Sequence, residues 1–278
     1  MLIQSRLVQL VEVVDVINFI AHSNPAKEAL KTANLLKTFS VNILITGEIG
    51  VGKKTLAKYI SPNTTIINAL EIDSFYQNYE NFKNNSRMII EDFHKIPNFQ
   101  NLKQFIEKKD LQIIATSTLE LNSKVMDNFF NITLHIPSLS SKEREKDIKP
   151  LVSKFLNEAE DFFKFNVEID KIDVSKIDKR YIDLTLNGNS LKKSVFMYYF
   201  FSQMKENEIM NLLEDYFFDN FGESDNYKNF LMMYEKPLIK AGLRKYKSQL
   251  QLSKVLGLNR NTLRKKINET NIFEEEQK

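Results

Sequence analysis

The sequence contains no cysteine among its 278 residues, and it has only three histidines. Without cysteine, disulfide bonds and thiolate metal sites are excluded. The histidines His22, His94 and His135 are scattered along the chain, which favours structural or surface roles over a shared metal site. The sequence therefore predicts no metal centre built from cysteine or clustered histidine.

Long apolar runs are also missing. No uninterrupted apolar stretch reaches the roughly 20 residues that a membrane-spanning helix needs. The partly apolar start, residues 1–19, is interrupted by Glu12 and Asp15, and no small-residue cleavage site follows it. With 42% hydrophobic and 27% charged residues, the composition is typical of a globular protein. We expect a cytoplasmic protein with no membrane segment, long enough for two domains.

One part of the chain has no acidic residues. Residues 236–268 contain ten Lys or Arg and no Asp or Glu. The other 29 basic residues stand against 36 acidic ones, so the rest of the chain carries a net charge of −7, which the total of +3 conceals. An acidic body with a basic end indicates that this end contacts a polyanion.

A glycine-rich stretch has the pattern of a phosphate-binding loop. Residues 47–55 read GEIGVGKKT, between an apolar run at 41–46 and a helical pattern at 56–60. Strand, glycine turn and helix form the context of a P-loop. Glycines let the backbone approach phosphates, and the amides at the helix start point at the anion. The sequence therefore predicts that ATP or ADP binds to Gly47, Glu48, Gly50, Gly52, Lys53, Lys54 and Thr55.

The position after the P-loop lysine departs from the usual pattern. Ser or Thr normally stands there, and its hydroxyl holds magnesium. In this chain the position is Lys54, and Thr55 comes one place later. The sequence supports nucleotide binding better than hydrolysis, with magnesium as a candidate cofactor held by Thr55 and Glu91.

Strand-like and helical patterns alternate through the first half of the chain. Further strands are expected at 64–69, 87–92, 111–117 and 131–136, and helices at 26–39 and 98–109. This alternation predicts an α/β fold with a parallel sheet covered on both faces. From residue 141 onward the chain is mostly helical, and we interpret its clustered Phe and Tyr as the core of a helical subdomain.

Several motifs of the first part resemble a known family. Residues 20–26 (IAHSNPA), the P-loop and residues 113–116 (IIAT) are similar to the AAA+ domain of bacterial enhancer-binding proteins, the sigma-54 activators. That family also begins its P-loop with Gly-Glu and has no hydroxyl residue after the lysine. Residues 125–147 resemble the end of its α/β core, and residues 187–189 (NGN) resemble the Pro-Gly-Asn of its lid.

The basic end resembles a second element of the same proteins. Residues 234–238 (YEKPL) and 256–267 (LGLNRNTLRKKI) are similar to the Fis-type helix-turn-helix that ends these activators. We expect helices at 248–256 and 259–269, with Gly257 in the turn. A recognition helix contacts base edges near its N-terminus, so Arg260 is the candidate for a guanine contact, whereas Asn259 either caps the helix or contacts DNA. The predicted DNA-binding residues are Asn259, Arg260, Asn261, Thr262, Arg264, Lys265 and Lys266.

Other features of the sigma-54 activators are missing. Their sigma-54 contact is a GAFTGA loop, but this chain has no glycine between Gly52 and Gly188. Their trans-acting arginines correspond to Asn122 and Asn128, and their lid arginine corresponds to Leu191. Because an arginine finger contributes several orders of magnitude to phosphoryl transfer, the resemblance implies weak hydrolysis or none.

The acidic pair after the third strand is inverted relative to that family. Walker B normally ends in Asp-Glu, whereas the order here is Glu91-Asp92. Both remain candidate catalytic residues, although each side chain has the wrong length for its role. Surface acids that merely follow a strand are the alternative interpretation.

Together these observations predict an AAA+ P-loop domain with a helical lid, followed by a small all-α helix-turn-helix domain. The expected divisions are an N-terminal segment at 1–18, the α/β core at 19–140, the lid at 141–206, a linker at 207–227, the helix-turn-helix at 228–270 and an acidic tail at 271–278. We expect a regulator of transcription that binds double-stranded DNA, dimerises through its C-terminal domain and is at most a weak ATPase, with RNA polymerase as a candidate partner. The alternatives are an active ATPase that remodels the sigma-54 holoenzyme and a nucleotide-dependent loader or initiator at DNA.

Overall fold

The computed structural model describes residues 19–77, 86–164, 177 and 179–269. The N-terminal segment 1–18 and the acidic tail 271–278 lie outside these residues. Contacts between Cα atoms divide the chain into two compact units, Met1–Gln203 and Met204–Lys278. Each unit is described by itself.

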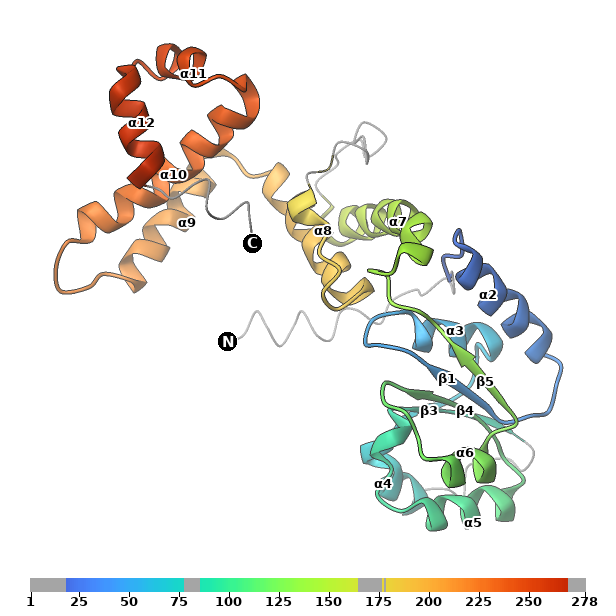
Figure 1. The fold of residues 1–278 in the computed structure, drawn as a ribbon. Coiled ribbons are helices and arrows are strands. Elements are labelled where there is room, and N and C mark those ends of the chain that lie inside the picture. The colour runs from blue at the N-terminus through green and yellow to red at the C-terminus, as the bar shows by residue number, and fades with distance from the viewer. Residues whose placement is uncertain (1–18, 78–85, 165–176, 178, 270–278) are drawn as a thin grey trace. The chain divides into compact units, whose positions relative to one another are not determined.

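A five-stranded parallel sheet forms the centre of the first unit, and Figure 1 shows the helices on either side of it. Its strands are β1 (Ile43–Thr46), β2 (Ile66–Asn68), β3 (Arg87–Glu91), β4 (Gln112–Ser117) and β5 (Ile132–His135). Their spatial order is β2-β3-β4-β1-β5, and every neighbouring pair is parallel. The predicted α/β fold is therefore confirmed, with each expected strand present and shorter by one to three residues.

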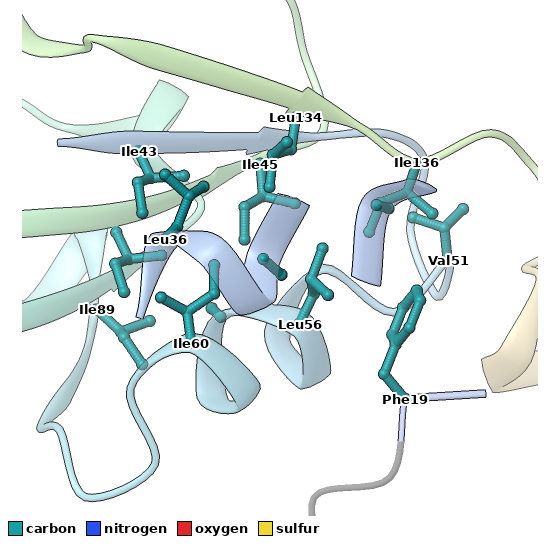
Figure 2. Packing of buried hydrophobic residues seen from close by; sticks show 14 of the residues in the cluster. Phe19, Leu36, Ile43, Ile45, Val51, Leu56, Ile60, Ile89, Leu134 and Ile136 are labelled. Atoms are coloured by element: carbon teal, nitrogen blue, oxygen red, sulfur yellow. The ribbon is translucent and has the colours of Figure 1, made fainter. Parts of the chain in front are cut away.

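Helices cover both faces of this sheet. Helices α2 (Asn24–Leu36) and α3 (Lys53–Ile60) lie on one face, and α4 (Ile72–Gln77), α5 (Phe99–Lys109) and α6 (Ser123–Phe129) lie on the other. Successive strand residues point to opposite faces, so Ile43 and Ile45 pack against the first pair of helices whereas Leu44 packs on the opposite side. Figure 2 shows the buried hydrophobic cluster on the α2 and α3 side of the sheet, which includes Ile43 and Ile45. The central strands are buried on both faces, which explains their continuous apolar sequence.

The helical lid follows the sheet within the same unit. It consists mainly of α7 (Glu145–Phe163) and α8 (Gly188–Ser202), with short 3₁₀ turns at Lys142–Arg144 and Lys179–Tyr181. Phe155 and Tyr199 are buried between the two helices, which confirms the interpretation of the aromatic clusters as core. Three members of these clusters depart from it, because Phe162, Phe200 and Phe201 remain exposed.

Among its described residues, the second unit has four helices: α9 (Glu206–Asp219), α10 (Asn226–Tyr246), α11 (Gln249–Val255) and α12 (Arg260–Glu269). The expected linker stretch, 207–227, thus carries most of a helix, and the chain turns between α9 and α10 near Gly222. A small core of Ile239, Leu252, Leu263 and Ile267 joins α10, α11 and α12. Val255, the last residue of α11, lies outside this core and is 55% exposed.

Candidate functional site

The P-loop connects the end of β1 to the start of α3. Gly47, Gly50 and Gly52 have φ angles of 142°, 79° and 107°, which side chains rarely adopt. Two of them also lie against other backbone. A Cβ atom on Gly47 would be 2.4 Å from the carbonyl oxygen of Ile136, and one on Gly50 would be 2.2 Å from that of Leu186. The loop thus needs glycine both for its backbone angles and for close packing.

Lys53 begins α3 and is only 8% exposed. Its ammonium donates hydrogen bonds to the carbonyl oxygens of Gly47 and Glu48 at 2.7 and 2.6 Å. Burial lowers the pKa of Lys53, and the nearby carboxylates of Asp92 and Glu48 oppose that shift. The lysine therefore ties the loop to the start of α3.

A cavity of about 470 Å³ opens beside this loop. Gly50, Gly52, Lys53, Lys54 and Thr55 of the predicted nucleotide site line it. Gly47 and Glu48 are not part of the lining, and their carbonyl groups hold Lys53 instead. The opposite wall comes from the ends of β3 and β4 and from the two lid helices. This volume lies in the range of small-molecule sites.

Glu91 and Asp92 both line this cavity, and each is paired with a lysine. The ammonium of Lys54 lies 3.2 Å from Oε2 of Glu91. That of Lys95 lies 2.7 Å from Oδ2 of Asp92. In the part of the chain that the structure describes, no group of three or more His, Cys, Asp or Glu is arranged to hold a metal ion.

The lid contacts the P-loop through Asn187. Its side-chain amide donates hydrogen bonds to Glu48 Oε2 at 3.0 Å and to the carbonyl oxygen of Ile49 at 2.9 Å. Its Oδ1 accepts a hydrogen bond from the N–H of Leu139 at 2.6 Å. The hydrogen bonds from Asn187 and then Ser138 keep the pKa of Glu48 below its usual value. Asn187 has the unusual angles φ 53° and ψ −129°, and such strained residues often lie at functional sites.

Lys192 is a pocket residue that the sequence analysis did not select. Leu191, where a lid arginine was sought, is fully buried in the lid core. Successive helical residues are rotated by about 100°, and Lys192 consequently reaches the cavity lining. Its ammonium lies 2.7 Å from Oε2 of Glu158 and 5.3 Å from the ring centre of Phe196. The lysine directly after Leu191 was the available sequence signal.

A buried ion pair supports the same wall of the site. Arg144 and Asp147 are 2% and 0% exposed, and their Nε and Oδ2 atoms are 2.8 Å apart. Arg144 also donates to the carbonyl oxygen of Val51 in the P-loop. Ser23 donates to Asp147 from its hydroxyl and its backbone N–H, both at 2.7 Å. Burial raises the pKa of Asp147, but the hydrogen bonds from Ser23, Arg144 and His22 together lower it further, so the net shift is downward.

The second unit places the predicted DNA-binding residues along α12. Leu263 and Ile267 face the core, whereas the exposed positions are Asn259, Arg260, Asn261, Thr262, Arg264 and Lys265. Asn259 caps the helix, since its Oδ1 accepts the N–H of Asn261 at 2.9 Å. Gly257 takes the left-handed turn conformation with φ 64°. Lys266 differs from the others, because it is half-buried and pairs with Glu235 on α10.

No helix among the described residues is long and apolar enough to cross a lipid bilayer.

The parallel sheet, the P-loop after β1 and the lid that contacts it define the first unit as an AAA+-type P-loop domain, and the second unit carries a helix-turn-helix. Family comparison agrees for each part. Residues 20–142 match the model described as Sigma-54 interaction domain, and residues 230–269 match the one described as Bacterial regulatory protein, Fis family. The chain thus combines a sigma-54 interaction domain with a Fis-family helix-turn-helix.

Solved structures of NtrX from Brucella abortus share the fold. The complex with ATP is 14% identical, with a TM-score of 0.54, covering 97% of this chain and 73% of that one. The complex with ADP is 16% identical, with a TM-score of 0.52, covering 96% and 72%. At these identities the likeness concerns the fold alone. A search of curated proteins gave no match.

Proposed function

We propose that the protein is a transcription regulator that binds double-stranded DNA through α12 and binds ATP or ADP in its AAA+-type domain. The observation that carries this proposal is the exposed face of α12. Arg260, Arg264 and Lys265 point away from the core of a helix-turn-helix in the part of the chain that matches the Fis family. Such a helix fits the major groove with its N-terminal residues near the bases.

Their positions and contacts divide five polar residues of α12 into three groups. Arg260 at the helix start is suited to a bidentate contact with guanine, whereas Thr262, Arg264 and Lys265 are suited to phosphates. Lys266 is engaged with Glu235 and holds α12 against α10. We therefore assign Lys266 a mainly structural role, with DNA contact as a secondary one.

Nucleotide binding is supported by the P-loop geometry and by the charges around the cavity. Lys53 lies at the start of α3 beside backbone N–H groups, an arrangement that favours phosphate. NtrX from Brucella abortus, which has a similar fold, was solved in complex with ATP and with ADP. Glu91 and Asp92 remain the candidate catalytic residues, although both are already bound to lysine.

Hydrolysis is expected to be poor, because the positions of the missing arginines have other roles. Asn122 caps α6, and its Oδ1 accepts the N–H of Val125. Asn128 accepts a hydrogen bond from Lys103, and Leu191 is buried in the lid. We propose that the nucleotide acts mainly as a ligand that stabilises the domain or its assembly.

The domain boundaries, the location of the protein, its oligomeric state and its protein partner also belong to the proposal. We retain the α/β core at 19–140, the lid at 141–206, the linker at 207–227 and the helix-turn-helix at 228–270. We also propose a cytoplasmic homodimer joined through the C-terminal domain, with RNA polymerase as a partner.

The test is a DNA-binding titration of the full chain over a series of salt concentrations, preceded by mapping of its genomic sites. We expect tight binding to the mapped duplex, weaker binding to random duplex, and affinity that falls linearly with the logarithm of the salt concentration. Equal, weak binding to both duplexes would contradict the assignment as a sequence-specific regulator.

The match to the sigma-54 interaction domain favours a second function, an active ATPase that remodels a sigma-54 holoenzyme. This function requires rapid ATP turnover and retention of the chain on immobilised sigma-54 holoenzyme. Fast turnover that DNA or holoenzyme stimulates would favour it over the ligand role.

A further inference from the structure

Every acidic residue that lines the nucleotide cavity, among those that the structure describes, is bound to at least one lysine. Glu91 is paired with Lys54, and Asp92 is paired with Lys95. The third, Glu158 of α7, is held by Lys192 of α8 at 2.7 Å and by its helical neighbour Lys154 at 3.6 Å. The negative charges of the cavity are thus already neutralised by the chain itself.

Magnesium, which nucleotide sites of this fold ordinarily use, does not fit these residues. Mg²⁺ requires nearly octahedral oxygen ligands at about 2.0–2.1 Å, usually one or two carboxylates together with phosphate and water. The residue directly after the P-loop lysine is Lys54, a cation that offers no metal ligand, and its ammonium is 3.2 Å from Oε2 of Glu91, the carboxylate expected to approach the metal. A magnesium ion bound to Glu91 would have to displace the ammonium of Lys54, and it would still lie near other lysines of the cavity.

We propose that the cavity binds the nucleotide without Mg²⁺, and that the ammonium of Lys54, oriented by Glu91, replaces the metal as the counter-ion of the outer phosphates. This inference rests on the proposed nucleotide binding and specifies the form of the ligand. The bound species is a metal-free nucleoside di- or triphosphate, and Glu91 is a positioning residue for Lys54.

The charge balance of the cavity supports this form of the ligand. Its lining includes the five basic residues Lys53, Lys54, Arg144, Lys154 and Lys192, against three acidic ones. A metal-free nucleoside triphosphate is more negative than its magnesium complex, and it gains more from an excess of fixed cations. Lysine also has three rotatable donors and no demand for octahedral geometry, so its ammonium can follow the phosphates.

The Lys54 side chain is placed so that its ammonium can leave Glu91 and bind a phosphate instead. Its side chain is 54% exposed, and Glu91 is 23% exposed. An ion pair at this exposure is weakly held, so Lys54 can leave Glu91 and turn to an incoming phosphate. Lys95 then remains on Asp92 and keeps the second carboxylate neutralised.

The experiment is calorimetric titration of the full chain with ATP and with ADP, in excess magnesium and in excess EDTA. For the parent protein we expect the Kd in EDTA to equal the Kd in magnesium or to be lower. For Lys54→Ser, which restores a hydroxyl and removes the charge, we expect binding in EDTA to weaken about tenfold or more and magnesium to recover part of it.

Two matched variants complete the design. Lys54→Arg keeps the charge and should retain magnesium-independent binding. Lys31→Ser removes an exposed lysine on α2 outside the cavity, and it should match the parent in both buffers. Thermal unfolding of each variant, without nucleotide, checks that the domain is folded.

Three results would overturn the inference. Parent binding that is about tenfold tighter in magnesium than in EDTA would show that the site uses the metal, while leaving nucleotide binding intact. Lys54→Ser binding that stays as independent of magnesium as the parent would remove Lys54 from the role. Absence of binding in both buffers would reject the proposed nucleotide site itself. This result differs from binding that requires magnesium, so failure of the site and failure of the metal-free inference are distinguished.

Discussion

Asn187 of the lid donates its side-chain amide to Glu48 of the P-loop across 3.0 Å, although the two residues are 139 positions apart in the chain. The backbone repeats the connection one residue later, where the N–H of Gly188 donates to the carbonyl oxygen of Gly50 at 3.0 Å. The start of the lid and the P-loop are therefore joined by hydrogen bonds into one structure. A substitution in the lid start should therefore alter the P-loop, and a substitution in the P-loop should alter the lid start.

Asn187→Asp tests this connection with almost no change of shape. The carboxylate cannot donate to Glu48 or to the carbonyl oxygen of Ile49, and it repels Glu48. Because Asn187 is buried, leaving these groups unpaired should reduce the free energy of unfolding by about 1–3 kcal/mol. Chemical denaturation of the parent and the variant measures the effect. Asn101→Asp, at an exposed position of α5, is the control and should change stability little.

Lys53→Ala tests the nucleotide site. Removing the ammonium abolishes its charge-assisted interaction with phosphate, so the affinity for ATP or ADP should fall at least about tenfold. Calorimetry measures the change, and Lys31→Ala on the exposed side of α2 should bind like the parent. A Lys53→Ala protein that is folded and binds nucleotide as tightly as the parent would contradict the P-loop assignment.

Steady-state turnover tests the expected weakness of hydrolysis. Asn122, Asn128 and Leu191 stand where arginines were sought, and an arginine finger contributes about 10³–10⁵ to the rate. We therefore expect ATP turnover at least roughly 10³-fold below that of a site with such a finger. Phosphate release with and without DNA is the measurement. Fast turnover that Lys53→Ala abolishes would mean that another residue, with Lys192 as the first candidate, supplies the charge.

Asp147→Asn tests the buried ion pair with Arg144. The variant leaves the buried guanidinium without a compensating charge, which should cost about 3–5 kcal/mol of stability at neutral pH. Asp161→Asn, exposed on the same helix, is the control. A loss equal to that of the control would show that the pair contributes little.

The same variant should change the pH dependence of stability. The folded-state pKa of Asp147 is lowered, so the unfolded chain binds the proton more readily. Its contribution is present above the unfolded pKa of about 3.9 and is lost as the pH falls through the lower folded value. The difference in unfolding free energy between parent and variant should therefore shrink in acid. Denaturation curves between neutral and acidic pH measure it.

Substitution of Arg260 and substitution of Lys265 should weaken DNA binding in different ways. Arg260→Ala should cost roughly 1–3 kcal/mol at the specific site and relax the preference at one base pair. Lys265→Ala should weaken specific and random duplexes about equally and reduce the salt slope by about one. Salt series on both duplexes measure this, with Lys228→Ala, at the start of α10, as the control. If neither variant differs from the control, α12 is not the DNA-reading helix.

Local features of the fold could be predicted from the sequence because they depend on neighbouring residues. Apolar runs marked the strands, glycines marked the P-loop, and Gly257 marked the turn between α11 and α12.

The sequence by itself thus determined the alternation of strands and helices, the glycine-rich P-loop and the basic second helix of the helix-turn-helix. Only the tertiary structure decided which charges meet. Lys54 lies on Glu91, Lys192 rather than Leu191 enters the cavity, and Asp147 joins Ser23 across 124 positions. The physical reason is that hydrogen bonds and ion pairs act over a few ångströms, so partners distant in the chain are selected by the packing of the sheet and lid.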